Sequence, residues 1–352
     1  MRHTEYGKTG RADGGRDARY GALREPDFAD KVGESGDKTM YQKEWFAMPG
    51  SGQKICLHRF MPDGAPRMVL QICHGMAEYL YRYRPFAEFL NAHGVLVCGI
   101  DHPGHGETEG QRGFFAERDG WQYLIEVNVE CSRRMHEDAA AQGVPYVILG
   151  HSMGSFVART IAAFHGECAD AYIFVGTAGR NPLLWLGRSV ARVQKALCGP
   201  RHVSGLLQTL NFGPYNRGDW EHRTDVDWVC SDPDVVDDYV ADEGCGFAFT
   251  ASAFYDLYSG LRVLQSEAWV QGLDPQKPYL LLAGDADPVG NRGKGVTEVY
   301  ERMKAAGIAD VTLRLYPGMR HEILNETGKE EVYETVWAWL TEHVLQEKDH
   351  ER

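Results

Sequence analysis

One pentapeptide, Gly150-His151-Ser152-Met153-Gly154, constrains the fold of this chain more than any other segment. It follows an apolar run at 146–149 and precedes a helix-like stretch at 156–163. A serine between two glycines on a strand-to-helix turn is the pattern of a nucleophile elbow, in which the serine stands exposed above a sheet. The pattern predicts a strained backbone at Ser152 and a clash for a Cβ at either glycine. The alternative is a plain helix N-cap after a buried strand.

The bulk properties exclude several classes of protein. A formal net charge of −13 over 352 residues argues against a nucleic-acid partner. The chain has no apolar run of about 18 residues and no apolar leader, which predicts a cytoplasmic protein without a membrane span. Its eight cysteines include no Cys-x-x-Cys pair, so we expect reduced thiols.

Three kinds of region follow one another along the chain. Residues 1–39 combine eight basic with eight acidic residues and seven glycines, and they are predicted to be a disordered extension. In residues 40–177 and 261–348 a hairpin is followed by apolar runs that alternate with helical segments. This alternation predicts an α/β fold with a mostly parallel, doubly wound sheet. Residues 178–260 interrupt the alternation for too long to form a simple loop, and we interpret them as an inserted, mainly helical cap.

Apolar runs and helical periodicity locate the expected elements of the core. The hairpin is expected over 44–48 and 54–60, and the later strands over 68–73, 95–100, 146–149, 171–175, 279–283 and 311–316. Helices are expected over 84–92, 120–141, 156–163, 297–306 and from about 329. In sheets of this kind, functional residues gather at the carboxyl ends of the strands.

The ends of two late strands supply the partners that a serine nucleophile needs. A hydroxyl becomes a good nucleophile only when a base takes its proton and a carboxylate orients that base. The run at 279–283 leads into Asp285 and Asp287, and the run at 311–316 leads into His321. The order Ser152, Asp287, His321 is the one that α/β-hydrolases use, with Asp285 as the alternative acid. Taken singly, each partner is also typical of an ordinary loop.

Acyl transfer also needs two backbone N–H groups to hold the tetrahedral oxyanion. Met153, directly after the nucleophile, is one candidate. The other is Met76, in the loop after the run at 68–73, where Gly75 permits a tight turn. An ordinary strand-terminal turn is the alternative interpretation of this loop.

His102 and His105 have a spacing that occurs in metal sites. They lie among glycines and a proline after an expected strand, and no further ligand follows at a spacing typical of metallohydrolases. A structural loop beside the elbow is therefore the preferred interpretation, and no metal or other cofactor is expected.

Over residues 40–345 the motifs and their order resemble the monoacylglycerol lipase and lysophospholipase group of α/β-hydrolases. The matching segments are 74–78, 82–83, 101–106, 110, 112–113, 150–154, 287–290 and 320–326. The resemblance implies the α/β-hydrolase fold, a triad of Ser152, Asp287 and His321, and oxyanion donors at Met76 and Met153. Tyr79 and Thr108 stand where many members have histidine and serine, respectively. These departures affect what the resemblance implies about substrate preference but not what it implies about the chemistry.

The function implied by the resemblance is that of a serine hydrolase. It would cleave carboxylic esters of lipid-like alcohols, monoacylglycerols or lysophospholipids, through an acyl-enzyme. A carboxylesterase for short-chain or aryl esters is the alternative, because pocket shape sets the acyl length. A non-catalytic ligand receptor on the same scaffold is a more distant alternative. The sequence leaves the oligomeric state open.

The predicted cap divides into a basic and an acidic half. Residues 171–218 contain six basic residues and no acidic one, whereas residues 219–243 contain ten acidic residues and a single arginine. Within the basic half, Leu183, Leu186, Val190, Val193 and Leu197 recur at helical spacing, with Arg188, Arg192 and Lys195 between them. This pattern predicts a basic amphipathic helix.

Two interpretations of that helix remain. In the first, the halves of the cap neutralise each other and the apolar face of the helix packs on the core. In the second, the helix contacts an anionic membrane surface or lipid head group. A channel for an acyl chain would then be lined by Trp185, Leu206, Leu207, Leu210, Phe212 and Phe247.

Overall fold

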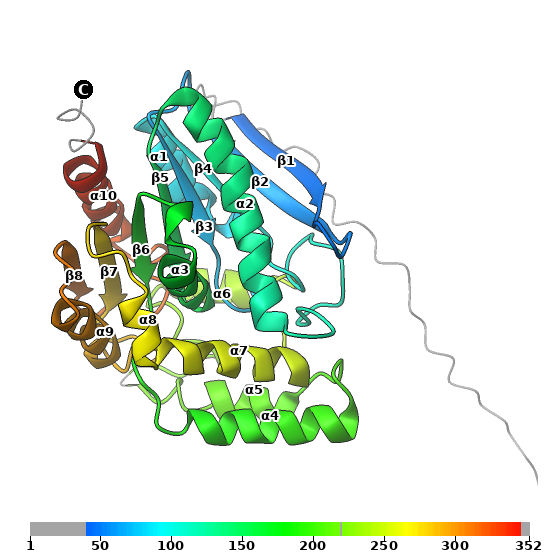
Figure 1. Cartoon of the computed structure of the whole chain (residues 1–352). Coiled ribbons are helices and arrows are strands. Elements are labelled where there is room, and N and C mark those ends of the chain that lie inside the picture. Colours follow the sequence, from blue (N-terminus) through cyan, green and yellow to red (C-terminus); the bar gives the residue numbers. More distant parts are fainter. Residues whose placement is uncertain (1–39, 219, 346–352) are drawn as a thin grey trace, which may run out of the picture. The chain divides into compact units, whose positions relative to one another are not determined.

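The computed structural model describes residues 40–218 and 220–345 (Figure 1). The extension predicted at 1–39 and the end of the predicted core, 346–348, lie outside these residues. Eight strands form one sheet in the order β1-β2-β4-β3-β5-β6-β7-β8. The hairpin β1-β2 and the pair β2-β4 are antiparallel, and all other neighbours are parallel. The predicted α/β class with a mostly parallel sheet is confirmed.

The elements agree with the expected ones to within a few residues at their ends. The strands are β1 Met40–Ala47, β2 Lys54–Met61, β3 Met68–Cys73, β4 Val95–Ile100, β5 Tyr146–His151, β6 Ala171–Val175, β7 Tyr279–Gly284 and β8 Val311–Tyr316. The helices of the core are η1 Leu80–Tyr83, α1 Arg84–Ala92, α2 Gly120–Gln142, α3 Met153–Phe164, η2 Gly166–Cys168, α9 Lys294–Ala305, α10 Lys329–Leu340 and η3 Thr341–Leu345. Among the described helices, none combines the length and apolar composition needed to cross a membrane.

Both faces of the sheet are covered by helices, because side chains of successive strand residues point to opposite faces. In β5, Tyr146 and Ile148 belong to the core cluster that includes α2, α3 and α9. Val147 and Leu149 belong to the cluster that includes α1 and α10. Every residue of β5 is buried, which explains why the strand is a continuous apolar run rather than an alternating one. Figure 1 shows α2 and α3 together on one face of the sheet.

The segment between β6 and β7 is helical. It contains α4 Leu184–Cys198, α5 Gly205–Phe212, α6 Pro233–Ala241, α7 Ala251–Leu264 and α8 Glu267–Gln271. α7 packs on α2 and α3 of the core, and α4 packs on α7 (Figure 1). The boundary expected at residue 260 lies inside α7, so a division of the chain into core and cap at that residue remains a prediction.

In the first interpretation of the basic helix, the packing of its apolar face on the core is wrong, because most of its apolar residues are exposed. Leu183, Leu186, Val193 and Leu197 expose 63%, 47%, 57% and 80% of their surface. The opposite side of α4 lies against α7, where Leu184 and Ala191 are buried and a Cβ at Gly187 would come within 3.1 Å of the Tyr258 ring. The small residues Gly187 and Ala191 let α4 and α7 approach closely, so the side of α4 that carries them is buried against α7.

The basic residues of α4 differ in their surroundings. The Arg188 guanidinium donates hydrogen bonds to Ser259 and Tyr255 of α7 and lies 4.4 Å from the centre of the Tyr255 ring. Lys195 also lies over that ring, at 5.4 Å. Arg192, in contrast, is exposed. Two of the three cations therefore hold α4 on α7, and one is directed to solvent.

The contact between α7 and α2 makes stability depend on pH. Asp256 of α7 is 4% exposed, and burial raises its pKa to about 6, although Lys195 and hydrogen bonds from Ser252 and the Gly120 backbone oppose the shift. The folded state therefore binds this proton more tightly than the unfolded chain, whose aspartate pKa is about 3.9. The stability contributed by the proton is complete below pH 4 and is lost as the pH rises through 6.

We expect Asp256→Asn to stabilise the protein above pH 6 but not below pH 4. The gain should reach about 3 kcal/mol, because one pKa unit corresponds to about 1.4 kcal/mol. Urea unfolding of both proteins from pH 4 to 8 measures it. Ser252→Ala, which leaves the carboxyl group in place, is the control: it should keep the dependence on pH or make it steeper, because it removes a hydrogen bond that opposes the shift. A gain for Asp256→Asn that does not change with pH would contradict the assignment.

Candidate active site

The serine of the pentapeptide lies at the turn between β5 and α3. Ser152 has φ 53° and ψ −121°, a conformation that costs a non-glycine residue about 1–3 kcal/mol. Its N–H donates to the carbonyl of Val175 at the end of β6, at 2.9 Å, and its carbonyl accepts from Ser155 of the first turn of α3. The predicted strain is confirmed, and a partly exposed hydroxyl is held at the carboxyl ends of two adjacent strands.

The two glycines of the pentapeptide are required by close backbone contacts. A Cβ at Gly150 would lie 2.2 Å from the carbonyl oxygen of Gly154. A Cβ at Gly154 would lie 1.9 Å from the carbonyl oxygen of Cys73, the last residue of β3. Because backbone atoms cannot move aside as a side-chain end can, the predicted clash at both positions is confirmed. The elbow is thus packed directly against the start of the loop that carries Met76.

His321 and Asp287 come together from the loops after β8 and β7. Nδ1 of His321 lies 3.0 Å from Oδ2 of Asp287, and the side chains are 4% and 0% exposed. The other oxygen of Asp287 accepts the N–H of Val289. With Nδ1 held by the carboxylate, Nε2 is the ring nitrogen that can accept a proton.

Asp285, the alternative acid, is exposed. Its Oδ1 accepts the N–H of Gly318 at 2.7 Å, so it ties the two loops together rather than touching the histidine. Gly176, at the end of β6, places the His321 ring: a Cβ at this glycine would lie 3.2 Å from Nδ1 and from Cε1. Among the described residues, the Ser152 hydroxyl makes no hydrogen bond with His321, a common arrangement in the absence of substrate.

The loop of Met76 lies beside the serine. A Cβ at Gly75 would be 3.2 Å from the Cβ of Ser152. The Gly75 N–H donates to Glu78, and Ala77, with φ 54°, donates its N–H to Nε2 of His105. Within the described part of the chain, the N–H groups of Met76 and Met153 have no hydrogen-bond partner, so both are available to an oxyanion.

A buried charge cluster, defined as Glu78, Arg82, Glu322, His151 and Tyr83, surrounds the back of the elbow. The Arg82 guanidinium donates to one oxygen of Glu78, at 2.7 Å, and to both oxygens of Glu322, at 2.8 and 2.7 Å. Glu78 also accepts from Tyr83 and lies 3.2 Å from Nδ1 of His151. His151 in turn lies 3.3 Å from the carbonyl of His321 through Nε2. The sequence motifs contain these residues but give no sign that they meet.

The charges of this cluster compensate one another. Burial alone would raise the pKa of Glu78, but His151 and Arg82 hold that pKa well below its usual range. Burial alone would lower the pKa of His151, and the hydrogen bond and charge of Glu78 raise it instead. The Glu78 carboxylate therefore stays ionised in a buried position, and the hydrogen bonds of Arg82 to Glu78 and Glu322 fix the loops that carry Met76 and His321 against the elbow.

The histidines at 102 and 105 are occupied by backbone groups. Nε2 of His102 lies 3.1 Å from the carbonyl of His74, and Nδ1 of His105 lies 3.1 Å from the carbonyl of Pro103. Burial lowers the pKa of His102 well below its usual value and that of His105 to about 4, so both rings are neutral. These contacts with backbone groups are those expected of a loop with a structural role, which is the interpretation that we preferred.

The six residues expected to line an acyl channel lie in different surroundings. Trp185, Leu206 and Leu210 expose 66%, 56% and 55% of their surface on α4 and α5. Leu207 is buried in the main core. Phe247 packs on His105, with ring centres 5.3 Å apart. The periodicity of a helix does not show which of its faces is covered, and for this reason these positions could not be separated by sequence alone.

An aromatic cluster of the cap, which we did not predict as a group, covers the histidine instead. The Trp228 ring lies 5.3 Å from the His321 ring. Phe212 stacks on Trp228 at 5.9 Å, and Tyr215 contacts it edge-on at 5.2 Å. Of the six expected lining residues, Phe212 alone belongs to this cluster. Its members come from a segment of irregular structure and from the end of α5, where no helical or strand pattern marks them.

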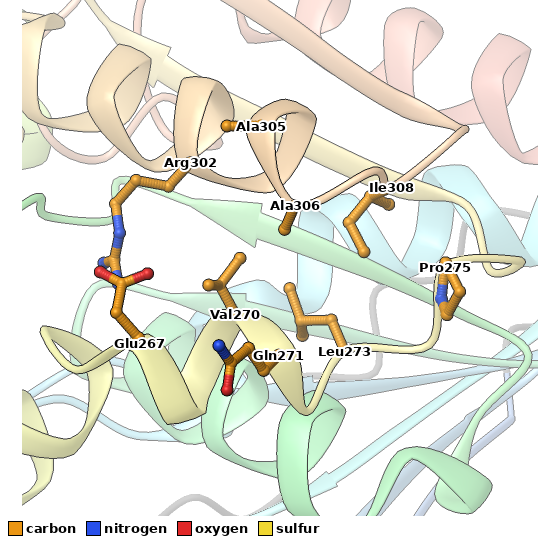
Figure 2. Close-up of a pocket in the computed structure, with 9 residues that line it drawn as sticks. All are labelled: Glu267, Val270, Gln271, Leu273, Pro275, Arg302, Ala305, Ala306 and Ile308. Atoms are coloured by element: carbon orange, nitrogen blue, oxygen red, sulfur yellow. The ribbon is translucent and has the colours of Figure 1, made fainter.

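A pocket of about 560 Å³ lies elsewhere, between α8 and α9 (Figure 2). Val270, Leu273 and Ile308 form apolar walls, and Glu267 lies beside Arg302 at one end. None of the candidate catalytic residues lines it.

Comparisons with known proteins identify a family and several relatives of this chain. Residues 64–328 match the Hydrolase_4 family, described as serine aminopeptidase, S33. The chain is 29% identical to a monoacylglycerol lipase of Mycolicibacterium smegmatis over 305 residues, covering 83% of this chain and 95% of that protein. It is 36% identical to the phospholipase YtpA of Bacillus subtilis over 280 residues, covering 79% and 97%. The structure of a thermostable carboxyl esterase from Bacillus coagulans superposes with a TM-score of 0.79 at 27% identity, covering 87% and 99%. The chain thus belongs to the Hydrolase_4 family of α/β-hydrolases.

Proposed function

We propose that this protein is a serine hydrolase of lipid-like carboxylic esters, with Ser152 as nucleophile and His321 and Asp287 as its partners. The observation that carries the proposal is the His321–Asp287 pair, which packs on the end of β6 next to the strained serine of β5. The N–H groups of Met76 and Met153, which have no partner among the described residues, support the same site. The relatives are hydrolases of this chemistry by name.

The reaction proceeds through an acyl-enzyme. Nε2 of His321 takes the hydroxyl proton of Ser152 while Oγ attacks the ester carbonyl, and Asp287 stabilises the imidazolium. The N–H groups of Met76 and Met153 hold the oxyanion of the tetrahedral intermediate. His321 then protonates the departing alcohol. Water, deprotonated by the same nitrogen, releases the acid and restores the serine.

The substrate class is proposed from the relatives and from the cap. A monoacylglycerol lipase and a phospholipase are among the similar proteins, and the aromatic cluster Phe212, Tyr215 and Trp228 provides an apolar cover over His321. Because the structure of a carboxyl esterase superposes with a TM-score of 0.79, hydrolysis of short-chain esters is the second candidate function.

A chain-length profile distinguishes these candidates. We expect p-nitrophenyl esters from acetate to palmitate to show an optimum at medium or long chains, with monoacylglycerol or lysophosphatidylcholine also hydrolysed. An optimum at acetate without turnover of either lipid would favour the short-chain esterase. Binding of lipids without any hydrolysis would favour a ligand receptor, and loss of turnover with a chelator would favour a metallohydrolase.

Contact of the cap with an anionic membrane is part of the proposal. The exposed apolar side of α4, with Trp185, Val193 and Leu197, adjoins the exposed Arg192. Apolar side chains next to a cation are typical of interfacial helices. A cytoplasmic location is proposed as well, on the ground that all eight cysteines are free.

We expect Arg192→Gln to lower activity on anionic vesicles by about five-fold, since one surface cation near such a membrane contributes about 1 kcal/mol. Soluble short-chain esters should be hydrolysed as before, and the vesicle effect should fade toward 1 M salt. Arg188→Gln is the matched control: it should lower both activities, because Arg188 holds α4 on α7. Equal losses on both substrates for Arg192→Gln would rule out the membrane contact.

A further inference from the structure

A second cluster of reactive side chains, Cys56, His58 and Asp101, lies outside the candidate active site. Cys56 and His58 alternate along β2 and therefore share one face, and Asp101 directly follows β4, which pairs with β2. Sγ of Cys56 lies 3.4 Å from Nε2 of His58, and that nitrogen lies 3.1 Å from Oδ2 of Asp101. The three residues are 0%, 2% and 1% exposed. Among the described residues, this is the one group of three potential ligands whose donor atoms all lie within 4.8 Å.

We propose that Cys56, His58 and Asp101 form a binding site for a divalent transition-metal ion of the Zn²⁺ class. One thiolate, one imidazole and one carboxylate form a ligand set of the kind that Zn²⁺ accepts. With bonds of about 2.3 Å to sulfur and about 2.1 Å to nitrogen and oxygen, a tetrahedral ion separates its ligand atoms by about 3.4–3.6 Å. The sulfur–nitrogen distance of 3.4 Å is nearly that already. The nitrogen–oxygen distance of 3.1 Å requires a small outward movement.

The surroundings hold the three side chains in the orientation that a metal needs. Nδ1 of His58 is 2.7 Å from the hydroxyl of Tyr41, an outer partner of the kind that fixes the ring of a metal-bound histidine. Asp101 accepts the N–H of Leu80 through Oδ1 and that of Glu107 through Oδ2. These contacts leave Oδ2 directed toward His58.

Metal binding needs no reagent other than the ion and water, because every displaced proton has an acceptor. The distances fit an arrangement in which Nε2 of His58 carries the hydrogen that faces Asp101 and Nδ1 accepts from Tyr41. When the metal binds Nε2, the ring proton is carried by Nδ1 and is donated to the Tyr41 oxygen. The thiol of Cys56 loses its proton to solvent and binds as thiolate. The net change is the release of one proton and the formation of three bonds to the ion.

The site is independent of the proposed hydrolysis. Asp101 fixes the N–H of Leu80, which begins the helical turn after the Met76 loop, so a bound ion would brace that loop without touching substrate. Tyr41, the outer partner of His58, is 37% exposed and stands two residues from Lys43, which pairs with Glu107 at the surface.

The test uses the full-length protein, stripped with a chelator and then freed of it, with Co²⁺ as the probe. We expect an absorption band in the near ultraviolet from charge transfer between a cysteine thiolate and Co²⁺, and we expect Zn²⁺ to abolish the band by displacement. Cys56→Ser should remove the band, and His58→Gln should weaken Co²⁺ and Zn²⁺ binding strongly. Cys198→Ser, which changes an exposed cysteine on α4, is the matched control and should keep it.

Because Cys56 and His58 are buried and their replacement can unfold the sheet, Tyr41→Phe provides a second variant. It removes only the outer hydroxyl and should weaken Zn²⁺ binding by about 10- to 100-fold. Zn²⁺ should also raise the Tm of the wild type more than that of the variant, reversibly with chelator. The proposal is overturned by the absence of the band in the wild type, by a band that survives Cys56→Ser, or by equal Zn²⁺ affinity of wild type and Tyr41→Phe.

Discussion

Replacing Ser152 by alanine is expected to lower kcat by a factor of about 10⁴ to 10⁶ while the protein stays folded. The loss is large because the substitution removes the atom that forms the acyl-enzyme. The fold should persist, since the side chain is partly exposed and its hydroxyl makes no hydrogen bond with any described residue, whereas the backbone of the elbow is held by Val175 and Ser155.

Activity on a p-nitrophenyl ester, circular dichroism and labelling by a fluorophosphonate provide the measurements. Labelling should disappear together with turnover. Ser189→Ala, on the exposed side of α4, is a suitable control and should keep both. A folded Ser152→Ala protein that retains more than a tenth of the activity would show that another residue is the nucleophile.

Replacing Asp287 by asparagine should lower kcat by about 10⁴, as the loss of the carboxylate in a serine triad does elsewhere. An asparagine amide can donate to Nδ1 of His321 and thereby hold the tautomer that cannot accept the serine proton at Nε2. The buried carboxylate, 3.0 Å from the ring, is the group that prevents this.

Asp285→Asn is the matched control, two residues away in the same loop. Its side-chain oxygen can still accept the N–H of Gly318, so kcat should change by no more than a few-fold. Measuring kcat for both variants on one soluble ester ranks them directly. If Asp285→Asn proved the more damaging change, the acid of the triad would have to be reassigned to Asp285.

The sequence was sufficient to predict the sheet and the loops at its carboxyl edge, for a definite physical reason. Strands buried on both faces must be continuous apolar runs, as in β5, and a strained elbow requires glycine at 150 and 154. Such constraints act between residues that are close in the chain, so the local pattern records them. The loops of Asp287 and His321 were identified by their position after the two last strands of the sheet, of which β7 is buried throughout and β8 only in part.

Other parts of the site depend on contacts that leave no local pattern. Arg82 and Glu322 are separated by 240 positions, and either could pair with many other charged residues. The sequence also could not show which side of α4 packs on the protein, because both sides carry apolar residues. The buried side proved to be the one with the small residues Gly187 and Ala191. Trp228 reaches His321 from a segment with neither helical nor strand periodicity.

The buried charge cluster restricts how the sequence of this protein can change during evolution. Glu78, Arg82 and Glu322 join the oxyanion loop to the histidine loop, and Glu322 also donates its N–H to Val229 of the cap segment. Loss of Arg82 alone would leave two buried carboxylates without the guanidinium that joins them, and loss of one carboxylate would leave the rest of the cluster unbalanced. Proteins that have lost one member of the cluster are therefore expected to be less stable than those with the complete set. The three charges are therefore expected to be exchanged as a set.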